Sequence, residues 1–389
     1  MNRINIPFLS LPALCIVLLT ATGIAGQGVR IARYWAGKKA AVSFTFDDGS
    51  PSHCTIAAPM FDSLGLKATF YVNPGDAEWA EFRKLALSGH EIGNHSMTHV
   101  CPFCIVTDPA VLQREVVASR DSITKNIGVV PMSFAHPCCC SFSDRQIRAY
   151  VLVYYPVDRL CGEMYLHPDN IDKALRGELD TSQYHIQKDW LILLAHDVSD
   201  PGNRDGLRTT LRYANARQDS LWIGTYANIG RYVRERDSAS LEVLAQTATN
   251  ITLRLRLLQS MRPDWYTVPL TVRIPVNADT VMTDVIPDGQ TVTVNYSDCY
   301  KKGKITRARP CGRPPRSVGG TVPPMRPTPA FGIRFSYVMS ADGHVLLRVS
   351  DAAGRVVAVP RGRQRGGFVR AGTRTSISAD RPQAKGLTF

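Results

Sequence analysis

The chain has 389 residues, of which 44% are hydrophobic and 20% are charged. This composition excludes a mostly disordered, collagen-like or multi-span membrane protein, and the length predicts two or three domains. The net charge is +13, but residues 301–389 hold 18 basic and 3 acidic residues, so the rest of the chain is close to neutral. The first 300 residues therefore lack the basic excess of a nucleic-acid-binding protein, and no nucleic-acid partner is predicted.

The N-terminus is predicted to be an export signal. Arg3 precedes an apolar run over residues 6–19, and small residues then lead to a predicted cleavage after Ala25. A single membrane anchor is the alternative, which Pro7 and Pro12 weaken. Residues 1–25 are therefore interpreted as a signal peptide.

The cysteine content indicates an oxidising compartment. The chain has ten cysteines, and such a density is more common outside the cytoplasm. Nine of them remain after removal of the signal peptide, so at least one thiol of a monomer stays unpaired. A zinc–thiolate site at Cys101-x-x-Cys104 is a weaker alternative, because no second well-spaced pair follows it.

Residues 39–237 alternate between short apolar runs and helical periodicity, which predicts parallel strands in a βα arrangement. The predicted elements, in chain order, are a strand over 40–46, a helix over 55–64, a strand over 68–72, a helix around 79–86, a strand over 91–94, a helix over 109–127 and strands over 132–135 and 190–195. In such folds the reactive side chains gather at the carboxyl ends of the strands.

The pattern changes after Arg236. Residues 238–298 alternate apolar and polar residues and predict a small β domain, with strands over 251–257, 270–274 and 292–296. A basic linker rich in Pro and Gly is predicted over 299–325, and a last β module over 326–389.

Three polar clusters each follow a predicted strand. Asp47 and Asp48 follow the first strand, His95-x-x-x-His99 follows the third, and His196 follows residues 190–195. Each cluster alone is typical of a turn, a solvated surface or a core histidine. Together they predict a metal site, because two imidazoles and one carboxylate leave an open position for water. A second carboxylate to accept a proton and a further histidine to donate one are the equipment for hydrolysis of an amide or an ester.

These residues resemble a known family. Residues 45–49 (TFDDG), 95–99 (HSMTH) and 193–196 (LLAH) are similar to motifs of the NodB-homology polysaccharide deacetylases, over about residues 36–237. The resemblance implies a distorted (β/α) barrel, here followed by small all-β modules, and removal of acetyl groups from an acetylated polysaccharide or oligosaccharide. By match to the motifs, the implied roles are Asp47 as general base, Asp48, His95 and His99 as ligands of a divalent metal, and His196 as general acid. Zinc is the first expectation for the metal, with cobalt, nickel and manganese as alternatives.

The chain departs from the family at its third motif. Ala135 stands where the family has an arginine that orients the base, and the backbone N–H of Cys138 is the predicted oxyanion donor. No aspartate of the fourth motif is found, and Asp158 is a poor match. Two alternatives to a carbohydrate deacetylase stay open: a carbohydrate-binding protein of the same fold without turnover, and a hydrolase of a non-sugar amide.

Two further pairings are predicted from the cysteines. A disulfide is expected between the loop of Cys101 and Cys104 and the loop of residues 138–140, where it would brace the rim of the site. Cys299 and Cys311 are expected to close a small loop in the linker.

The end of the chain resembles the C-terminal sorting modules of the type IX secretion system. Residues 333–336 (IRFS), 343–349 (GHVLLRV) and 351–357 (DAAGRVV) carry this resemblance. It implies secretion machinery as a partner and a location outside, or on the surface of, a Gram-negative cell. An ordinary β accessory module with a basic face is the alternative.

Overall fold

The structure is a computed structural model that describes residues 28–296, except for 76, 140–144, 183–185, 267 and 277–278, and beyond them the strands β14–β21. The predicted signal peptide and the Cys299–Cys311 pairing lie outside the described residues. The chain divides into two compact units, residues 1–316 and 317–389. The finer domain boundaries expected from the sequence stay a prediction.

A parallel sheet of seven strands forms the first part of unit 1. Its order is β6-β5-β4-β3-β2-β7, and β8 also pairs with β2. The strands are β2 (Ala40–Phe46), β3 (Thr69–Val72), β4 (Glu91–Asn94), β5 (Ser133–Ala135), β6 (Val157–Arg159), β7 (Trp190–Ala195) and β8 (Leu221–Ile223). All seven residues of β2 are buried, as expected for a continuous apolar run with helices outside it.

The chain beyond β6 closes this sheet. Glu163 forms a parallel bridge with Leu193 of β7. Its N–H donates to the carbonyl of Ile192 at 2.7 Å, and its carbonyl accepts from the N–H of Leu194 at 2.9 Å. The two ends of the strand order therefore meet, and the predicted distorted (β/α) barrel is confirmed.

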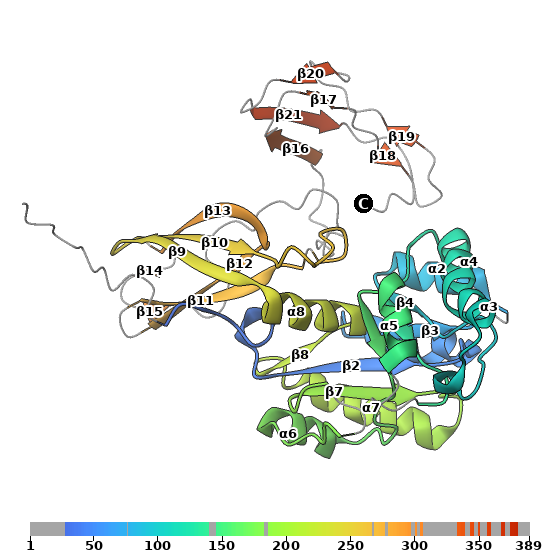
Figure 1. Ribbon diagram of the computed structural model, residues 1–389. Coiled ribbons are helices and arrows are strands. Elements are labelled where there is room, and N and C mark those ends of the chain that lie inside the picture. Colours follow the sequence, from blue (N-terminus) through green and yellow to red (C-terminus); the bar gives the residue numbers. More distant parts are fainter. Residues whose placement is uncertain are drawn as a thin grey trace, which may run out of the picture. The chain divides into compact units, whose positions relative to one another are not determined.

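Helices surround the barrel, with α6 and α7 beside β7 and with α2 and α4 near β4 (Figure 1). They are α1 (Ala58–Ser63), α2 (Trp79–Leu87), α3 (Pro109–Leu112), α4 (Ser119–Ile127), α5 (Arg145–Tyr154), α6 (Pro168–Arg176), α7 (Pro201–Asn215) and α8 (Tyr226–Ser238). Short π-helices, His53–Ala57 and Gln113–Ala118, continue into α1 and α4. The predicted helix over 109–127 thus exists as α3, a π-turn and α4, and Gly128 ends it with a φ of 89°.

Two antiparallel sheets follow the barrel in unit 1. One has the order β1-β11-β12 and the other β13-β10-β9. Their strands are β1 (Arg30–Ile31), β9 (Ser240–Gln246), β10 (Asn250–Arg256), β11 (Leu270–Val276), β12 (Asp279–Val285) and β13 (Asp288–Asn295). Alternate residues of β10 and β11, such as Ile251, Leu253 and Val272, share one hydrophobic cluster with Tyr232 of α8. The sequence did not predict β1, which precedes the barrel and pairs with β11.

The remaining strands are short and antiparallel. β14 (Tyr300–Lys301) pairs with β15 (Lys304–Ile305) in unit 1. In unit 2, β16 (Ile333–Val338) pairs with β21 (Arg374–Ala379), β17 (Gly343–Val345) with β20 (Gly367–Val369), and β18 (Val349–Ser350) with β19 (Val356–Ala358). A sorting role for this unit stays a prediction. Across the described residues, the helices lack the length and apolar character that crossing a membrane requires.

Candidate active site

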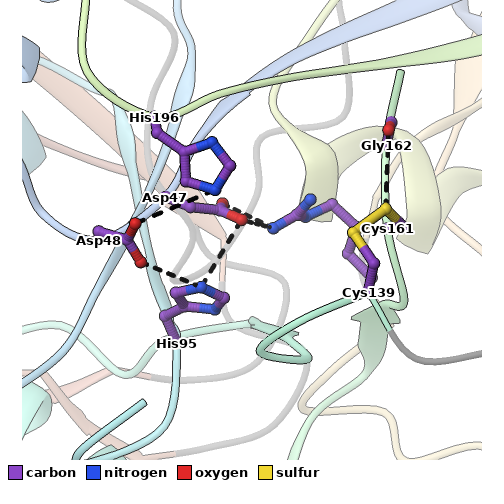
Figure 2. Close-up of a disulfide and its surroundings, with 8 residues drawn as sticks. Asp47, Asp48, His95, Cys139, Cys161, Gly162 and His196 are labelled. Carbon is purple, nitrogen blue, oxygen red and sulfur yellow. Dashed lines mark hydrogen bonds and ion pairs between the residues drawn. A yellow bond between two sulfur atoms is a disulfide. The ribbon is translucent and has the colours of Figure 1, made fainter. Parts of the chain in front are cut away.

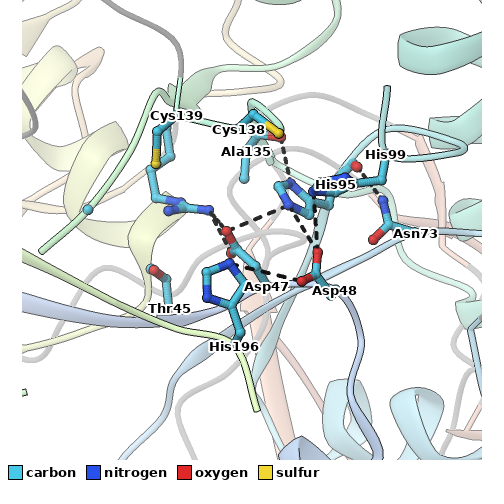
Figure 3. Close-up of polar contacts among 12 residues, drawn as sticks. Thr45, Asp47, Asp48, Asn73, His95, His99, Ala135, Cys138, Cys139 and His196 are labelled. Atoms are coloured by element: carbon cyan, nitrogen blue, oxygen red, sulfur yellow. Dashed lines mark hydrogen bonds and ion pairs between the residues drawn. The ribbon is translucent and has the colours of Figure 1, made fainter. Parts of the chain in front are cut away.

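Three predicted ligands meet at the carboxyl ends of β2 and β4. The ligand atoms of Asp48, His95 and His99 all lie within 4.8 Å of one another. Nε2 of His95 is 3.4 Å and Nε2 of His99 is 3.5 Å from the same oxygen, Oδ1 of Asp48. Figure 3 shows the three side chains facing one another. This group forms a possible site for a metal ion.

The backbone around the ligands is unusual and well anchored. Asp48, Ser96 and His99 have φ values of 71°, 65° and 53°, in the left-handed region that residues other than glycine rarely adopt. The amide of buried Asn73 donates to the carbonyls of His95 and Ser96 and so holds this turn. Such backbone is found where the surrounding structure imposes a functional geometry.

The hydrogen bonds of His95 fit a metal ligand. Its Nδ1 lies 2.9 Å from the carbonyl oxygen of Ala135, which only accepts, so Nδ1 carries the proton. Nε2 of His95 is thereby directed at Asp48. The hydrogen bond from His95 is the first cause of the lowered pKa of the Asp48 carboxyl. A divalent cation bound between the two side chains would take the place of this hydrogen bond, so the residues fit a metal.

The predicted base, Asp47, lies beside the ligands and is paired with an arginine. Asp47 directly follows β2 and is buried, with Oδ2 at 3.6 Å from Nε2 of His95. Nη2 of Arg159 donates to Oδ1 of Asp47 at 2.6 Å and also contacts Oδ2. Burial has the largest effect on the pKa of Asp47 and raises it, but the charges of Arg159 and His95 outweigh burial and hold this pKa below its usual value.

Arg159 corrects the expectation that no arginine orients the base. The family's arginine comes from the strand that ends here at Ala135, whereas Arg159 ends the neighbouring strand, β6. The guanidinium is 4.9 Å from the ring centroid of Tyr71, and this ring packs where a Cβ on Gly93 would lie 2.4 Å away. Arg159 is thus held between the base and a buried aromatic ring.

Asp158, the poor match to the fourth motif, belongs to a different ion pair from that of Arg159 and Asp47. Its carboxylate accepts from Nε and Nη2 of Arg148, at 2.8 and 3.2 Å, and lies 3.3 Å from Nε2 of His136. Because side chains alternate along a strand, Asp158 and its neighbour Arg159 point in opposite directions. Once β6 has been recognised as a strand, this alternation indicates that Arg159 faces Asp47 and that Asp158 faces the other side of the strand.

The predicted acid, His196, follows β7 on the other side of the two aspartates (Figure 2). Its Nε2 is 4.0 Å from Oδ2 of Asp48, and its side chain is half exposed. The carbonyl of His196 accepts a 2.6 Å hydrogen bond from Nε2 of His53, a buried residue that the sequence analysis did not single out. Burial lowers the pKa of His53 and favours the neutral ring that makes this contact.

Two disulfides hold the loop that contains Cys138. Cys101 pairs with Cys138, which confirms the predicted disulfide between the two loops. Cys139 pairs with Cys161, two residues beyond Arg159, and this second disulfide was not predicted (Figure 2). Among the described cysteines, Cys54 and Cys104 are free. The Cys138 amide, the predicted oxyanion donor, therefore lies in a segment linked to the chain beyond β4 and beyond β6.

The carboxyl rim of the (β/α) barrel thus carries two imidazoles, one carboxylate and a buried aspartate paired with an arginine, an arrangement that includes a possible metal site. The family model described as polysaccharide deacetylase matches residues 36–151. The matched residues include the TFDDG and HSMTH motifs, so the family model agrees with the resemblance that these motifs predicted.

Curated relatives match parts of the chain. A gellan lyase from Bacillus sp. is 24% identical over 281 residues, which are 62% of this chain and 11% of that protein. A chitooligosaccharide deacetylase from Rhizobium leguminosarum bv. trifolii is 33% identical over 87 residues, which are 21% of this chain and 39% of that protein. The chain thus spans less than half the length of either relative.

Solved structures of similar fold have low sequence identity. A family 4 acetyl xylan esterase from Clostridium thermocellum, in complex with a cobalt ion, is 23% identical and covers 49% of this chain and 89% of its own, with a TM-score of 0.35. A family 4 carbohydrate esterase from Streptomyces lividans, in complex with acetate, is 20% identical and covers 48% of this chain and 93% of its own, with a TM-score of 0.36.

Proposed function

We propose that the barrel domain is a metal-dependent hydrolase that removes acetyl groups from a carbohydrate. The observation that carries this proposal is the position of Asp47, which is buried, paired with Arg159 and adjacent to the three ligand side chains. A carboxylate kept ionised next to a metal site is suited to accept a proton from water.

Each side chain has a distinct role in the proposed reaction. Asp48, His95 and His99 would hold the metal, whose chemistry when bound would be to polarise the acetyl carbonyl and to lower the pKa of water. Asp47 accepts the proton of the attacking water, and Arg159 keeps the Asp47 carboxylate ionised and oriented. His196, half exposed across from the ligands, donates a proton to the leaving nitrogen or oxygen of the sugar. The N–H of Cys138 stabilises the oxyanion.

The proposed substrates are N-acetylglucosamine polymers, peptidoglycan and acetylxylan. The family match and the chitooligosaccharide deacetylase among the relatives support acetylated sugars over other amides. The missing third-motif arginine is the reason for the alternative of binding without turnover. The contact between Arg159 and Asp47 removes that reason and favours turnover.

Acetate release from chitooligosaccharides, peptidoglycan and acetylxylan tests the proposal. The Asp47→Asn variant is expected to lose at least about a hundredfold in kcat, the usual contribution of a general base. Asp62→Asn, which changes a carboxylate on α1 that pairs with Lys67, is the matched control and is expected to retain activity. Equal acetate release by wild type and Asp47→Asn would refute the assigned base, and no release by wild type from any substrate would refute the function.

We also propose that the protein is exported. The two disulfides support an oxidising compartment, because disulfides rarely persist in the cytosol. N-terminal sequencing of the protein recovered from a secreting host is expected to begin after Ala25. An N-terminus at Met1, in protein that stays inside the cell, would contradict export.

A further inference from the structure

An aromatic pair lies exposed just beyond the residue that closes the barrel. Tyr165 is 64% exposed, although tyrosine rings usually bury most of their apolar surface. Its ring is stacked on that of His167, with centroids 5.0 Å apart and planes 8° apart. Met164, next to it, is 63% exposed. Together these residues present a flat apolar surface to the solvent.

The backbone holds this aromatic pair in place. The N–H of Tyr165 donates to Oε1 of Glu163, and its carbonyl accepts from the N–H of His167 and from Nδ2 of Asn170, each at 2.9 Å. Asn170 is buried. The imidazole of His167 in turn accepts from the N–H of Asp169 at 3.3 Å and caps helix α6. An exposed ring on a backbone with this many contacts loses little conformational freedom when a ligand binds.

The pair emerges at the same end of the barrel as the catalytic residues. Glu163 pairs in parallel with Leu193, so the segment after Glu163 and the segment after Leu193 leave the sheet in the same direction. The first segment reaches Tyr165 after two residues, and the second reaches His196 after three. The exposed rings therefore belong to the rim that carries the proposed general acid.

We propose that Tyr165, stacked on His167, is a subsite for a sugar ring of the substrate, next to the ring that loses its acetyl group. A pyranose has a face of C–H groups that packs on an aromatic plane, while its hydroxyls stay in water and reach a phenolic O–H at the edge. The carboxylate of Asp169 lies 3.4 Å from Nδ1 of His167 at the border of this aromatic surface, where carboxylate oxygens can accept hydrogen bonds from sugar hydroxyls. This inference rests on the proposed function, because it assigns a second sugar contact to that site.

Chain-length dependence tests the subsite. The Tyr165→Ala variant is expected to raise KM for a chitooligosaccharide of five sugars roughly tenfold, the factor expected for loss of one aromatic contact. The rise for a two-sugar substrate is expected to be much smaller. Tyr165→Phe and Tyr165→Trp keep a ring and are expected to restore a KM near that of wild type. Leu258→Ala removes a side chain of similar exposure, 57%, from the loop after β10 and serves as the control.

Several results would overturn the subsite. An equal KM change at both chain lengths, no change in Tyr165→Ala, or failure of the ring-retaining variants would each contradict it. Calorimetric binding of the five-sugar oligomer to Asp47→Asn, with and without Tyr165→Ala, separates the subsite from the proposed function. If wild type releases no acetate but adding Tyr165→Ala to Asp47→Asn still weakens binding about tenfold, the deacetylase function fails and the sugar subsite stands. Equal binding of the oligomer by Asp47→Asn and by the double variant refutes the subsite.

Discussion

Replacing Arg159 with methionine removes the cation beside the predicted base and keeps an unbranched side chain of comparable length. The two side chains are almost fully buried, with 1% of Arg159 and 4% of Asp47 exposed. Methionine packs in such a site but leaves the Asp47 carboxylate without its charged partner. Two consequences are expected, a loss of stability and a change in the pH range over which the base is ionised.

The size of the stability loss follows from the geometry of the pair. Nη2 of Arg159 is 2.6 Å from Oδ1 of Asp47, so the two charges are centred about 4 Å apart, where attraction at an effective dielectric constant of about 20 is about 4 kcal/mol. Removing one partner of a buried ion pair typically costs about 3–5 kcal/mol in the free energy of unfolding. The two figures agree. At a pH above the pKa of Asp47, Arg159→Met is therefore expected to lose about 3–5 kcal/mol in the free energy of unfolding.

The sign of the pH effect follows from the two influences on Asp47. Burial raises the pKa of this carboxyl, and the charge of Arg159 lowers it below the usual value. A lowered pKa stabilises the fold above the unfolded pKa, and this stabilisation is lost as the pH falls through the folded pKa. Without Arg159, burial dominates and the pKa of Asp47 rises. The acid limb of the kcat/KM profile of Arg159→Met is then expected to move to higher pH.

The assay is acetate release as a function of pH, with urea unfolding of the same proteins. Arg159→Lys keeps a cation but not the contact with both carboxylate oxygens, so its acid limb is expected near that of wild type and its kcat below it. Arg148→Met breaks the neighbouring pair with Asp158 and controls for a general loss of stability. The reasoning is refuted if Arg159→Met keeps the wild-type acid limb and kcat/KM, or if Arg148→Met moves the limb equally.

Two further predictions concern the metal and the second disulfide. Dialysis against a chelator is expected to abolish acetate release, and added Zn²⁺ or Co²⁺ is expected to restore it. The His99→Ala variant is expected to need at least about tenfold more metal for half-maximal activity. Full activity after verified metal removal would contradict metal dependence. The double variant Cys139→Ser/Cys161→Ser opens a disulfide of sequence separation 22 and is expected to lose about 3 kcal/mol in the free energy of unfolding, measured by urea titration. It is also expected to lower kcat/KM, because Cys161 lies two residues beyond Arg159. Cys54→Ser, which changes a free thiol, is the control, and wild-type values for the double variant would exclude a role of this disulfide.

The parts of the fold that the sequence predicted are those with a strong local pattern. The apolar run that forms β2 and the strand β7 have the predicted bounds, Ala40–Phe46 and Trp190–Ala195. Each carries at least six apolar or small residues in a row and is buried along its length. The three ligand side chains were predicted from the resemblance of TFDDG and HSMTH to the family motifs and from their positions after predicted strands.

The parts that the sequence did not predict depend on contacts between distant residues. Strand β6 has only three residues, too few to show a period of two, so Arg159 had no recognisable element to place it. The hydrogen bond from Arg159 to Asp47 joins residues 112 positions apart. The partner of Cys139 was equally hidden, because the spacing of cysteines does not determine their connectivity.

Ala135 and Arg159 together show why a missing motif residue is weak evidence for lost activity in this fold. The two residues are paired neighbours in register on β5 and β6, so either position directs its strand end to the same rim. The base needs a cation within hydrogen-bonding distance, and this requirement does not specify which strand supplies it. The backbone carbonyl of residue 135 orients His95, and this contact does not depend on the side chain at that position. The site therefore keeps the charge beside Asp47 although its sequence motif is incomplete, and the Arg159 variants measure whether that charge is sufficient.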